Sequence, residues 1–279
     1  MRNTMIVTDS TAELPRKTIE ELGITVLPWR LLVGAETLVD SPRLRSVAFY
    51  KSLVKKRAIP STIAPSPQQF ASIYTTLAKR TDDIVSIHSS ARFTKTVASA
   101  NKGRVGLLGR CQIHVIDSQF ISWPLGVLVT EAAKAAQRGA SGHEIVRLVH
   151  GMIARTYIAF FVETTEYLRR SGLFPSAYHA MGRSAGFKPL LLMEEGEFVP
   201  LYRSRGRGTP VERLVEFVTE FQKLQRVAIL YTGLRPGISE LKTQLTEALG
   251  EQEIEEHIYS PILAAHIGPS ARGVAIFEG

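Results

Sequence analysis

Cysteine is almost absent from this chain: Cys111 is the only one among its 279 residues. A single thiol excludes an intramolecular disulfide, a CxxC redox motif and a cysteine-rich zinc site. Long apolar runs are missing as well. No stretch approaches the roughly 18 residues that suggest a membrane span, and the first residues contain no apolar segment of signal-peptide length. These absences together predict a protein of the reducing cytoplasm.

Acidic residues are fewer than basic ones, 26 against 34, which gives a formal net charge of +8. An excess of positive charge is typical of proteins that bind nucleic acids, membranes or acidic partners. Here lysine and arginine are spread along most of the chain without a long basic run, whereas a nucleic-acid surface is expected to show clustering. We therefore expect no nucleic-acid partner.

The sequence also lacks the common signatures of nucleotide and metal chemistry. It contains no Gly-x-x-x-x-Gly-Lys phosphate loop, no complete GxGxxG after a strand and no HExxH. The seven histidines are scattered without the spacing of metal ligands. We expect neither a metal nor a cofactor.

One segment matches a catalytic motif in its residues, but the predicted secondary structure around it does not fit that motif. Residues 182–186 read Gly-Arg-Ser-Ala-Gly, which matches the GxSxG nucleophile elbow. That motif needs a strand before the serine and a helix after it. Residues 175–181 indicate a helix instead, and Lys188-Pro189 would stop a helix that followed. This context disfavours a hydrolase built on the motif.

What the chain does contain is a repeated arrangement of short apolar runs that stop at small polar residues. The runs cover residues 5–7, 84–87, 113–116, 227–230 and 262–265. Apolar runs bounded by polar turns, with helical patterns between them, are typical of parallel strands in βαβ units. Ligands of such sheets bind beyond the carboxyl ends of the strands. Hydroxyls and backbone N–H groups at these ends, with few charges, favour a small oxyanion as the ligand.

The order of these patterns predicts an α/β fold of two α/β domains with parallel-rich sheets, at residues 1–154 and 155–279. Further strands are expected at 24–28 and 156–162, and an antiparallel hairpin at 189–193 and 198–203. Helices are expected from Pro15, at 44–56, 67–80, 94–103 and 122–138, from Ser141, and at 163–168, 210–224 and 236–249. Ser141, followed three residues later by Glu144, has the capping-box pattern that begins a helix.

Two threonines and one histidine stand where a ligand could be held. Thr62 lies in a proline-rich loop at 60–67, and Thr94 lies where a helix is expected to start. A threonine at a helix start is commonly only an N-cap, but a hydroxyl beside the positive end of a helix can also bind a carboxylate. His266 ends a predicted strand and precedes the turn 268–270, whose N–H groups could face the same ligand. A lone histidine is otherwise more often structural.

These residues, in their order along the chain, resemble the DegV family of bacterial fatty-acid-binding proteins. The opening Ile6–Pro15 is similar to the start of the family almost letter for letter, and residues 62–67 are similar to its Thr-Ser-Gln-Pro-Ser-Pro loop. Further segments match in the expected order: 23–28, Val39-Asp40, 115–118, 166–168, Lys188-Pro189 and 265–269. Each piece is short, but the ordered set covers essentially the whole chain.

The resemblance implies a lipid held between two α/β domains, of which the N-terminal one carries the head-group loops and the C-terminal one forms a lid and an acyl tunnel. Matching positions imply that the fatty-acid carboxylate is bound by Thr62, Thr94 and His266. The residues expected to support this site are Ser10, Ser90, Thr96, Asp117, Ser118 and Gly268. The best-understood members of the family present the fatty acid to a separate kinase, which makes an acyl phosphate, and do no bond chemistry themselves.

The chain departs from the family pattern at several of these places. Ile63-Ala64 replaces Ser-Gln in the first loop, Lys95 replaces the glycine of a Ser-Gly-Thr segment, and Ser270 replaces a glycine. The family's Gly-Gly-Arg-Ile segment reads Ser-Gly-Leu-Phe at 171–174, so that Leu173 stands in place of its arginine. The remaining cations that we expect to face a partner are Arg169, Arg170, Arg203 and Arg205.

The leading hypothesis is a cytoplasmic, non-enzymatic carrier that binds a long-chain fatty acid. A fatty acid kinase is the implied partner, and transient membrane contact is compatible with this role. The alternative is a hydrolase or acyltransferase that uses a Ser/Thr–His pair at the same strand ends. An acid that orients the histidine would favour the alternative, and the sequence identifies no such residue. Loss of the family's arginine is expected to weaken coupling to a kinase more than lipid binding.

Overall fold

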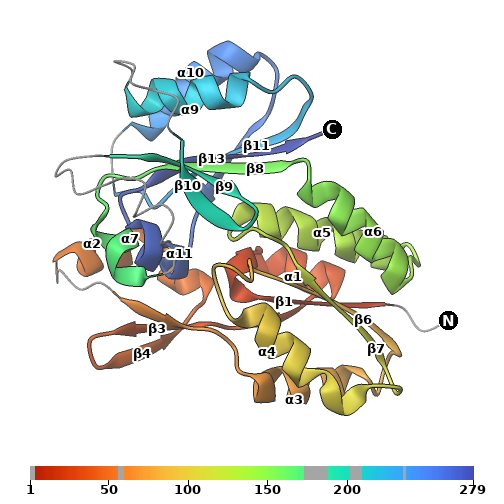
Figure 1. Cartoon of the computed structure of the whole chain (residues 1–279). Coiled ribbons are helices and arrows are strands. Elements are labelled where there is room, and N and C mark those ends of the chain that lie inside the picture. The colour runs from red at the N-terminus through yellow and green to blue at the C-terminus, as the bar shows by residue number, and fades with distance from the viewer. Residues whose placement is uncertain (1–3, 56–59, 173–187, 202–208, 235–236) are drawn as a thin grey trace.

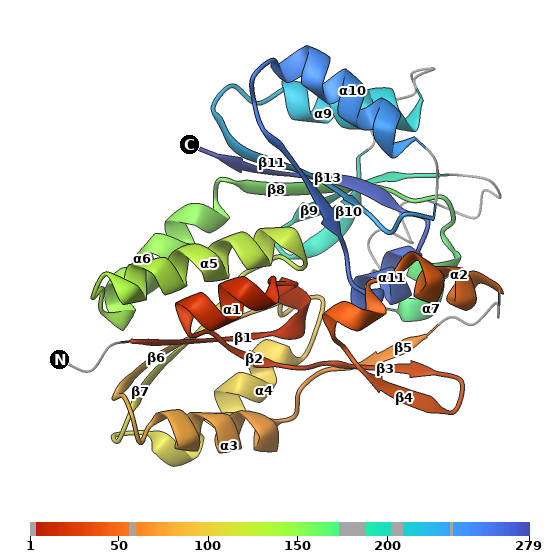
Figure 2. The same ribbon diagram turned by 180° about the vertical axis from the view of Figure 1, so that it is seen from behind.

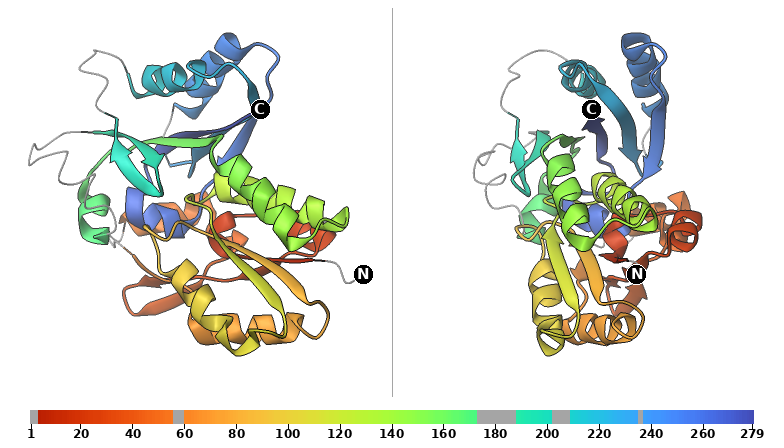
Figure 3. Two further views of the ribbon diagram at one scale, coloured as in Figure 1. Left: turned by 45° about the vertical axis from the view of Figure 1, so that its right-hand side comes forward. Right: turned by 90° about the vertical axis from the view of Figure 1, so that its right-hand side faces the viewer.

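Three β-sheets and the helices between them make up the computed structural model of the chain, which describes residues 4–55, 60–172, 188–201, 209–234 and 237–279. A four-stranded sheet from the first half of the chain lies below a six-stranded sheet from the second half (Figure 1). Helices α5 (Trp123–Gln137) and α6 (Gly142–Ile153) lie between these two layers (Figure 3). Within the described residues, no helix combines the length and the apolar character that crossing a bilayer requires.

The four-stranded sheet is entirely parallel and has the order β2-β1-β6-β7. Its strands are β1 (Met5–Asp9), β2 (Thr25–Leu27), β6 (Asp83–His88) and β7 (Gln112–Asp117). Successive residues such as Ile6 and Val7 enter different apolar clusters, because side chains alternate between the two faces of a strand. Helices therefore have to cover both faces. These four strands confirm the positions predicted from the sequence.

The helices of the first half cover the parallel sheet as the sequence predicts. Helices α3 (Pro67–Leu77) and α4 (Thr96–Gly103) pack on one face, and α1 (Arg16–Leu22), α5 and α6 lie on the other (Figure 1). The predicted capping box is present, because the Ser141 hydroxyl accepts from the N–H of Glu144 while a Glu144 carboxylate oxygen accepts from the N–H of Ser141. Short 3₁₀ helices are η1 (Ser10–Ala12), η2 (Pro42–Leu44) and η3 (Val105–Leu107).

The six-stranded sheet has the order β10-β9-β8-β13-β11-β12 and is largely antiparallel, with β11 and β12 as its parallel pair. Its strands are β8 (Thr156–Phe161), β9 (Leu190–Glu194), β10 (Glu197–Pro200), β11 (Leu224–Tyr231), β12 (Ile254–Ile258) and β13 (Arg272–Glu278). Helices α9 (Pro210–Thr219) and α10 (Ile238–Leu249) cover its outer face. The predicted hairpin is confirmed as β9 and β10.

The third sheet, β4-β3-β5, is small and antiparallel, and it was not predicted. Its strands are β3 (Arg30–Val33), β4 (Glu36–Val39) and β5 (Ser61–Ile63). It lies at one end of the molecule with α2 (Val47–Lys55), α7 (Glu166–Ser171) and α11 (Pro261–Ile267) (Figure 2). This cluster brings together segments that are about 200 residues apart in the sequence, such as β5 and α11.

The prediction for the last part of the chain is wrong. The apolar run 262–265, expected to be a strand, lies within helix α11, whose first residue Pro261 follows the N-cap Ser260. Strands β12 and β13 were not predicted. The two-part α/β fold class is nevertheless confirmed, but the expectation of parallel-rich sheets holds only for the first half, because β11 and β12 form the single parallel pair of the six-stranded sheet. The division at residue 154 stays an interpretation of the sequence, and the chain passes there from α6 into β8.

Candidate functional site

Thr62 and His266 meet between the small sheet and helix α11. The Thr62 hydroxyl oxygen lies 3.2 Å from Nε2 of His266, although 204 positions separate them in the sequence. The pair lines a cavity of about 330 Å³ together with Pro60, Ser61, Ala265, Arg170 and Ser171. The structure thus brings together two of the three residues predicted to bind a carboxylate.

Local structure fixes both members of this pair. Thr62 is the middle residue of β5 and pairs with Leu31 of β3, a fully buried residue. The Thr62 side chain therefore points to the buried face of the small sheet, whereas its neighbours in β5 point to the other face. His266 is in the last turn of α11, which ends at Gly268 with a backbone φ of 89°. A glycine is favoured there because a side chain rarely adopts that conformation.

Burial determines the charge of His266. The side chain is almost fully buried, and the cost of burying a charge lowers the pKa of this imidazole from 6.5 to about 3. The ring is therefore neutral at physiological pH, with one nitrogen that donates and one that accepts. The ring of Phe93 packs edge-on against it, with centroids 4.8 Å apart. A neutral histidine can orient a carboxylate by donating one hydrogen bond.

Thr94, the third predicted ligand, follows Phe93 and lies at the start of α4. Its hydroxyl accepts from the backbone N–H of Thr96 at 3.1 Å and donates to the Thr96 hydroxyl at 3.0 Å. The Ser89 hydroxyl lies 3.4 Å away. The Thr94 hydroxyl thus satisfies the N–H of the first residue of α4, as a helix cap does. Its role as a ligand stays a prediction. Lys95, which immediately precedes α4, makes no side-chain cap.

Two predicted supporting residues connect neighbouring segments. The Ser10 hydroxyl accepts from the N–H of Trp29 at 3.0 Å, which joins η1 to the start of β3. The Ser90 hydroxyl donates to the carbonyl oxygen of Gly196 at 2.7 Å, which joins the end of β6 to the β9–β10 hairpin. Both side chains are buried and both have partners within the protein.

Of the other supporting residues, Thr96 bonds to Thr94 as described above, and Asp117, Ser118 and Gly268 shape turns. The Asp117 carboxylate accepts from the N–H groups of Ala91 and Gln119, at 3.1 and 2.9 Å. The Ser118 hydroxyl donates to the carbonyl of Phe120 at 3.1 Å, and the carbonyl of Gly268 accepts from the Tyr259 hydroxyl at 3.0 Å. These contacts order the loops at the strand ends. Their support of a bound carboxylate remains a prediction.

A buried acid–histidine pair, Asp9 and His88, lies beneath the same strand ends. Asp9 Oδ2 lies 2.9 Å from Nδ1 of His88, and His88 Nε2 lies 2.7 Å from the Ser86 hydroxyl, which accepts from the Tyr74 hydroxyl. The order of groups is that of a catalytic triad. Asp9, Ser86 and His88 are all inaccessible to solvent, however. We interpret them as a hydrogen-bonded core that holds β1 against β6.

Of the two described cations expected to face a partner, Arg169 and Arg170, it is Arg170 that lines the Thr62–His266 cavity. Its guanidinium forms an exposed ion pair with Glu166, one turn earlier in α7, at 2.8 Å. Arg169 is exposed on the same helix. Arg203, Arg205, Leu173 and the Gly-Arg-Ser-Ala-Gly segment at 182–186 lie outside the described residues. The sequence alone could not place Arg170 beside His266, because α7 and α11 are far apart along the chain.

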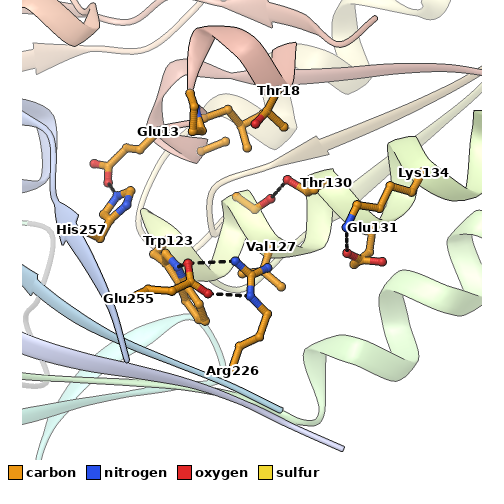
Figure 4. A pocket seen from close by; sticks show the side chains of 14 residues that line it. Glu13, Thr18, Trp123, Val127, Thr130, Glu131, Lys134, Arg226, Glu255 and His257 are labelled. Carbon is orange, nitrogen blue, oxygen red and sulfur yellow. Dashed lines mark hydrogen bonds and ion pairs between the residues drawn. The ribbon is translucent and has the colours of Figure 1, made fainter. Parts of the chain in front are cut away.

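A second cavity, of about 320 Å³, lies on a seam between the two halves of the chain (Figure 4). Glu13 is fully enclosed there and lies 2.6 Å from Nε2 of His257. Burial alone would raise the pKa of Glu13, but hydrogen bonds and charges from His257, Arg45 and Ser122 outweigh it and lower the pKa. Glu13 therefore stays ionised and ties η1 to β12.

The other contacts of this seam are paired in the same way. The Arg226 guanidinium donates twice to the Glu255 carboxylate, at 2.7 and 2.9 Å, and the Trp123 indole N–H donates to it at 2.9 Å (Figure 4). Arg226 also lies over the Trp123 ring, 5.0 Å from its centroid. The seam thus joins the two halves with satisfied polar groups. Within the described residues, no group of three or more acidic, histidine or cysteine side chains is arranged to hold a metal ion.

Comparison with known proteins identifies the family. The sequence profile described as "Uncharacterised protein, DegV family" matches residues 3–279. The chain belongs to the DegV family. A DegV domain-containing protein of Deinococcus radiodurans is 30% identical over 275 residues, which are 97% of each chain. The resemblance inferred from the sequence is therefore confirmed.

Solved structures agree with this membership. A DegV family protein from Thermus thermophilus, whose structure is described as showing fatty acid binding, is 26% identical and superposes with a TM-score of 0.87 over 99% of this chain and all of that one. DegV of Bacillus subtilis, at 24% identity, has a TM-score of 0.88 over the full length of both chains. The likeness to the second shows a shared fold.

Proposed function

We propose that this DegV protein binds a long-chain fatty acid and that Thr62 and His266 hold its carboxylate. The observation that carries the proposal is the hydroxyl–imidazole pair, 3.2 Å apart, that closes one side of a cavity. A neutral His266 donates one hydrogen bond and the Thr62 hydroxyl another. Thr94, next to Phe93, is the proposed third ligand. The fatty-acid binding of the Thermus thermophilus relative supports the same ligand class.

Apolar burial is ample for such a ligand. Each buried methylene contributes about 0.8 kcal/mol, so that a ~16-carbon chain contributes about 11 kcal/mol before ordering costs. The polar groups then need only to orient the head. We place the acyl chain among apolar side chains between the two halves, starting from the Phe93 ring, which contacts His266.

The protein presents the bound acid to a separate kinase and breaks no bond itself. Phosphoryl transfer to a carboxylate requires a cation beside the transferred group. Arg170 lines the cavity with Thr62 and His266, and its guanidinium is half-exposed, so that it is accessible to a partner. The family pattern has an arginine at the position of Leu173. In this proposal Arg170 supplies the positive charge of that missing arginine.

A transient membrane contact fits the outer face of the small sheet. Arg30 pairs in register with Val39 on one side and Ile63 on the other, and all three side chains are exposed. Thr62, one residue before Ile63, points to the opposite face. Aliphatic side chains around a cation suit an anionic lipid surface. We propose a cytoplasmic carrier that collects its ligand at the membrane.

The hydrolase alternative rests on the same pair, because 3.2 Å is within the reach of a nucleophile and its base. A general base is most effective when its pKa is near the working pH. Burial lowers the pKa of His266 to about 3, which makes it a poor base at neutral pH. The carrier is therefore the better supported function.

The test is native mass spectrometry of purified protein loaded with palmitate. We expect one fatty acid per chain in the wild type and much weaker retention in Thr62→Ala and His266→Ala. Thr75→Ala, an exposed threonine of α3, is the matched control and should retain the ligand. A wild type that never retains palmitate or oleate, or that releases an altered acid, contradicts the proposal.

A further inference from the structure

The turn 90–94 connects the candidate site to the six-stranded sheet. Its backbone is closed by the carbonyl of Ser90, which accepts from the N–H groups of Phe93 and Thr94 at 3.1 and 2.8 Å. The Ser90 hydroxyl also accepts from the N–H of Arg92 at 3.2 Å. Ser90 thus sets the position of Phe93, whose ring packs on His266 at a centroid distance of 4.8 Å.

The β9–β10 hairpin holds this turn from the other half of the chain. The hydroxyl of Ser90 donates to the carbonyl oxygen of Gly196, which lies in the hairpin turn, at 2.7 Å. One residue on, Glu197 forms an ion pair with Arg92 at 3.1 Å. The turn is therefore held at both ends by the second half of the chain, at Ser90 by the hairpin and at Phe93 by His266.

The Ser90 hydroxyl occupies the place that a side chain at Gly196 would take. This residue has a φ of 85°, and a Cβ placed on it would lie 2.3 Å from the Ser90 hydroxyl oxygen and 3.4 Å from the Ser90 Cβ. A real Cβ does not approach a heavy atom so closely, so that the Ser90 hydroxyl would have to rotate away or the backbone would have to shift, and either change disturbs the hydrogen bond from Ser90 to Gly196. Since the hairpin is paired with β8 in a six-stranded sheet, we expect the change to fall on Ser90 and on the turn 90–94 that its hydroxyl holds.

We infer that the Gly196 turn is a positioning element of the acyl head-group site. It acts through Ser90 and Phe93 on His266 and makes no contact with the ligand itself. This inference rests on the proposed function, because the group being positioned is the one proposed to bind the carboxylate. According to this inference, the β9–β10 hairpin contributes to the affinity for the acyl ligand in addition to its contribution to the stability of the fold.

The experiment compares palmitate affinity and thermal stability in four variants of the full chain. Gly196→Ala introduces the clash. Gly139→Ala is the matched control, since Gly139 has a similar φ of 89° but open space around it. Ser90→Ala removes the hydroxyl without introducing a clash. It tests the same contact if Gly196→Ala does not fold. The double variant Ser90→Ala with Gly196→Ala takes away the atom that the new methyl would strike.

We expect Gly196→Ala to weaken palmitate binding at least tenfold and Gly139→Ala by less than twofold, even where both melt earlier. Ser90→Ala should weaken binding about two- to tenfold, the scale of one lost hydrogen bond. The double variant should bind better than Gly196→Ala alone. The NMR shifts of the His266 ring should change in Gly196→Ala and stay unchanged in Gly139→Ala.

The inference is overturned if Gly196→Ala, or Ser90→Ala where the first does not fold, binds palmitate as the wild type does. It is also overturned if Gly139→Ala loses as much affinity as Gly196→Ala, or if removing the Ser90 hydroxyl gives the double variant no advantage. A wild type that binds no fatty acid is a different outcome, because it refutes the proposed function before the hairpin is tested.

Discussion

Replacing His266 by alanine perturbs the candidate site at its most buried polar group. The substitution removes the imidazole that lies 3.2 Å from the Thr62 hydroxyl and packs on Phe93. A hydrogen bond to a charged acceptor contributes about 1.5–3 kcal/mol. A water molecule can replace part of this hydrogen bond. We therefore expect acyl binding to weaken by about 1–3 kcal/mol, which raises Kd about 5- to 150-fold.

The assay is a titration of delipidated protein with palmitate, with His150→Ala as the control because His150 is exposed on α6. Wild type and His150→Ala should bind equally. Because burial lowers the pKa of His266 to about 3, the ring stays neutral and the affinity should not change between pH 6 and 8. Unchanged affinity in His266→Ala, or wild-type affinity that falls as the pH rises through about 6.5, would refute a neutral histidine as carboxylate ligand.

Three further perturbations test other parts of the structure. The pKa of His266 is lower in the folded chain than its ordinary value of 6.5, so that the unfolded chain binds the proton more readily. The stability that neutral His266 contributes is therefore present above pH 6.5 and is lost as the pH falls. We expect the Tm of His266→Ala to decline less steeply than that of the wild type between pH 6.5 and 4. Burial raises the pKa of Asp40 from 3.8 to about 6, so the wild type loses stability as the pH rises through this window; Asp40→Asn should gain stability relative to the wild type at pH 8 but not at pH 4, and equal differences at both pH values would contradict this. Arg170→Ala should keep palmitate affinity within about threefold while phosphorylation by a family kinase falls at least tenfold; Leu173→Arg should raise that phosphorylation, and turnover indifferent to both changes would exclude an arginine requirement.

Much of the first half of the fold follows from local sequence. Its strands are apolar runs that end in polar residues, and Ser141 with Glu144 begins a helix as a capping box should. The small sheet could not be predicted in this way, because strands of three or four residues contain too few positions to show an alternating pattern. Strand β12 is a five-residue edge strand in which two adjacent glutamates, Glu255 and Glu256, interrupt any alternation of apolar and polar residues.

The error at α11 has a specific cause. A run of four apolar residues fits a buried strand or a buried helix equally well. The deciding signal was Ser260-Pro261, since serine at the N-cap and proline at the first helical position begin helices. As a result His266 was placed at a strand end, although it lies in a helix.

The candidate site itself could not be derived from spacing. Thr62 and His266 are 204 positions apart, and only the pairing of β5 with β3 and the packing of α11 against both bring them together. Their selection came from resemblance to the family. Arg170 and the Gly196–Ser90 contact show the same limit, because each depends on segments from different halves of the chain.

The central claim is that this chain is a fatty-acid carrier, and its most direct test is the identity of what it binds. Protein purified from the cells that naturally make it should be denatured and extracted, and the extract analysed by mass spectrometry. We expect an unmodified fatty acid of about 16 to 18 carbons near one equivalent per chain, together with a rise in Tm when that acid is added to delipidated protein. An empty protein whose Tm does not respond to any fatty acid of about 12 to 20 carbons would contradict the account.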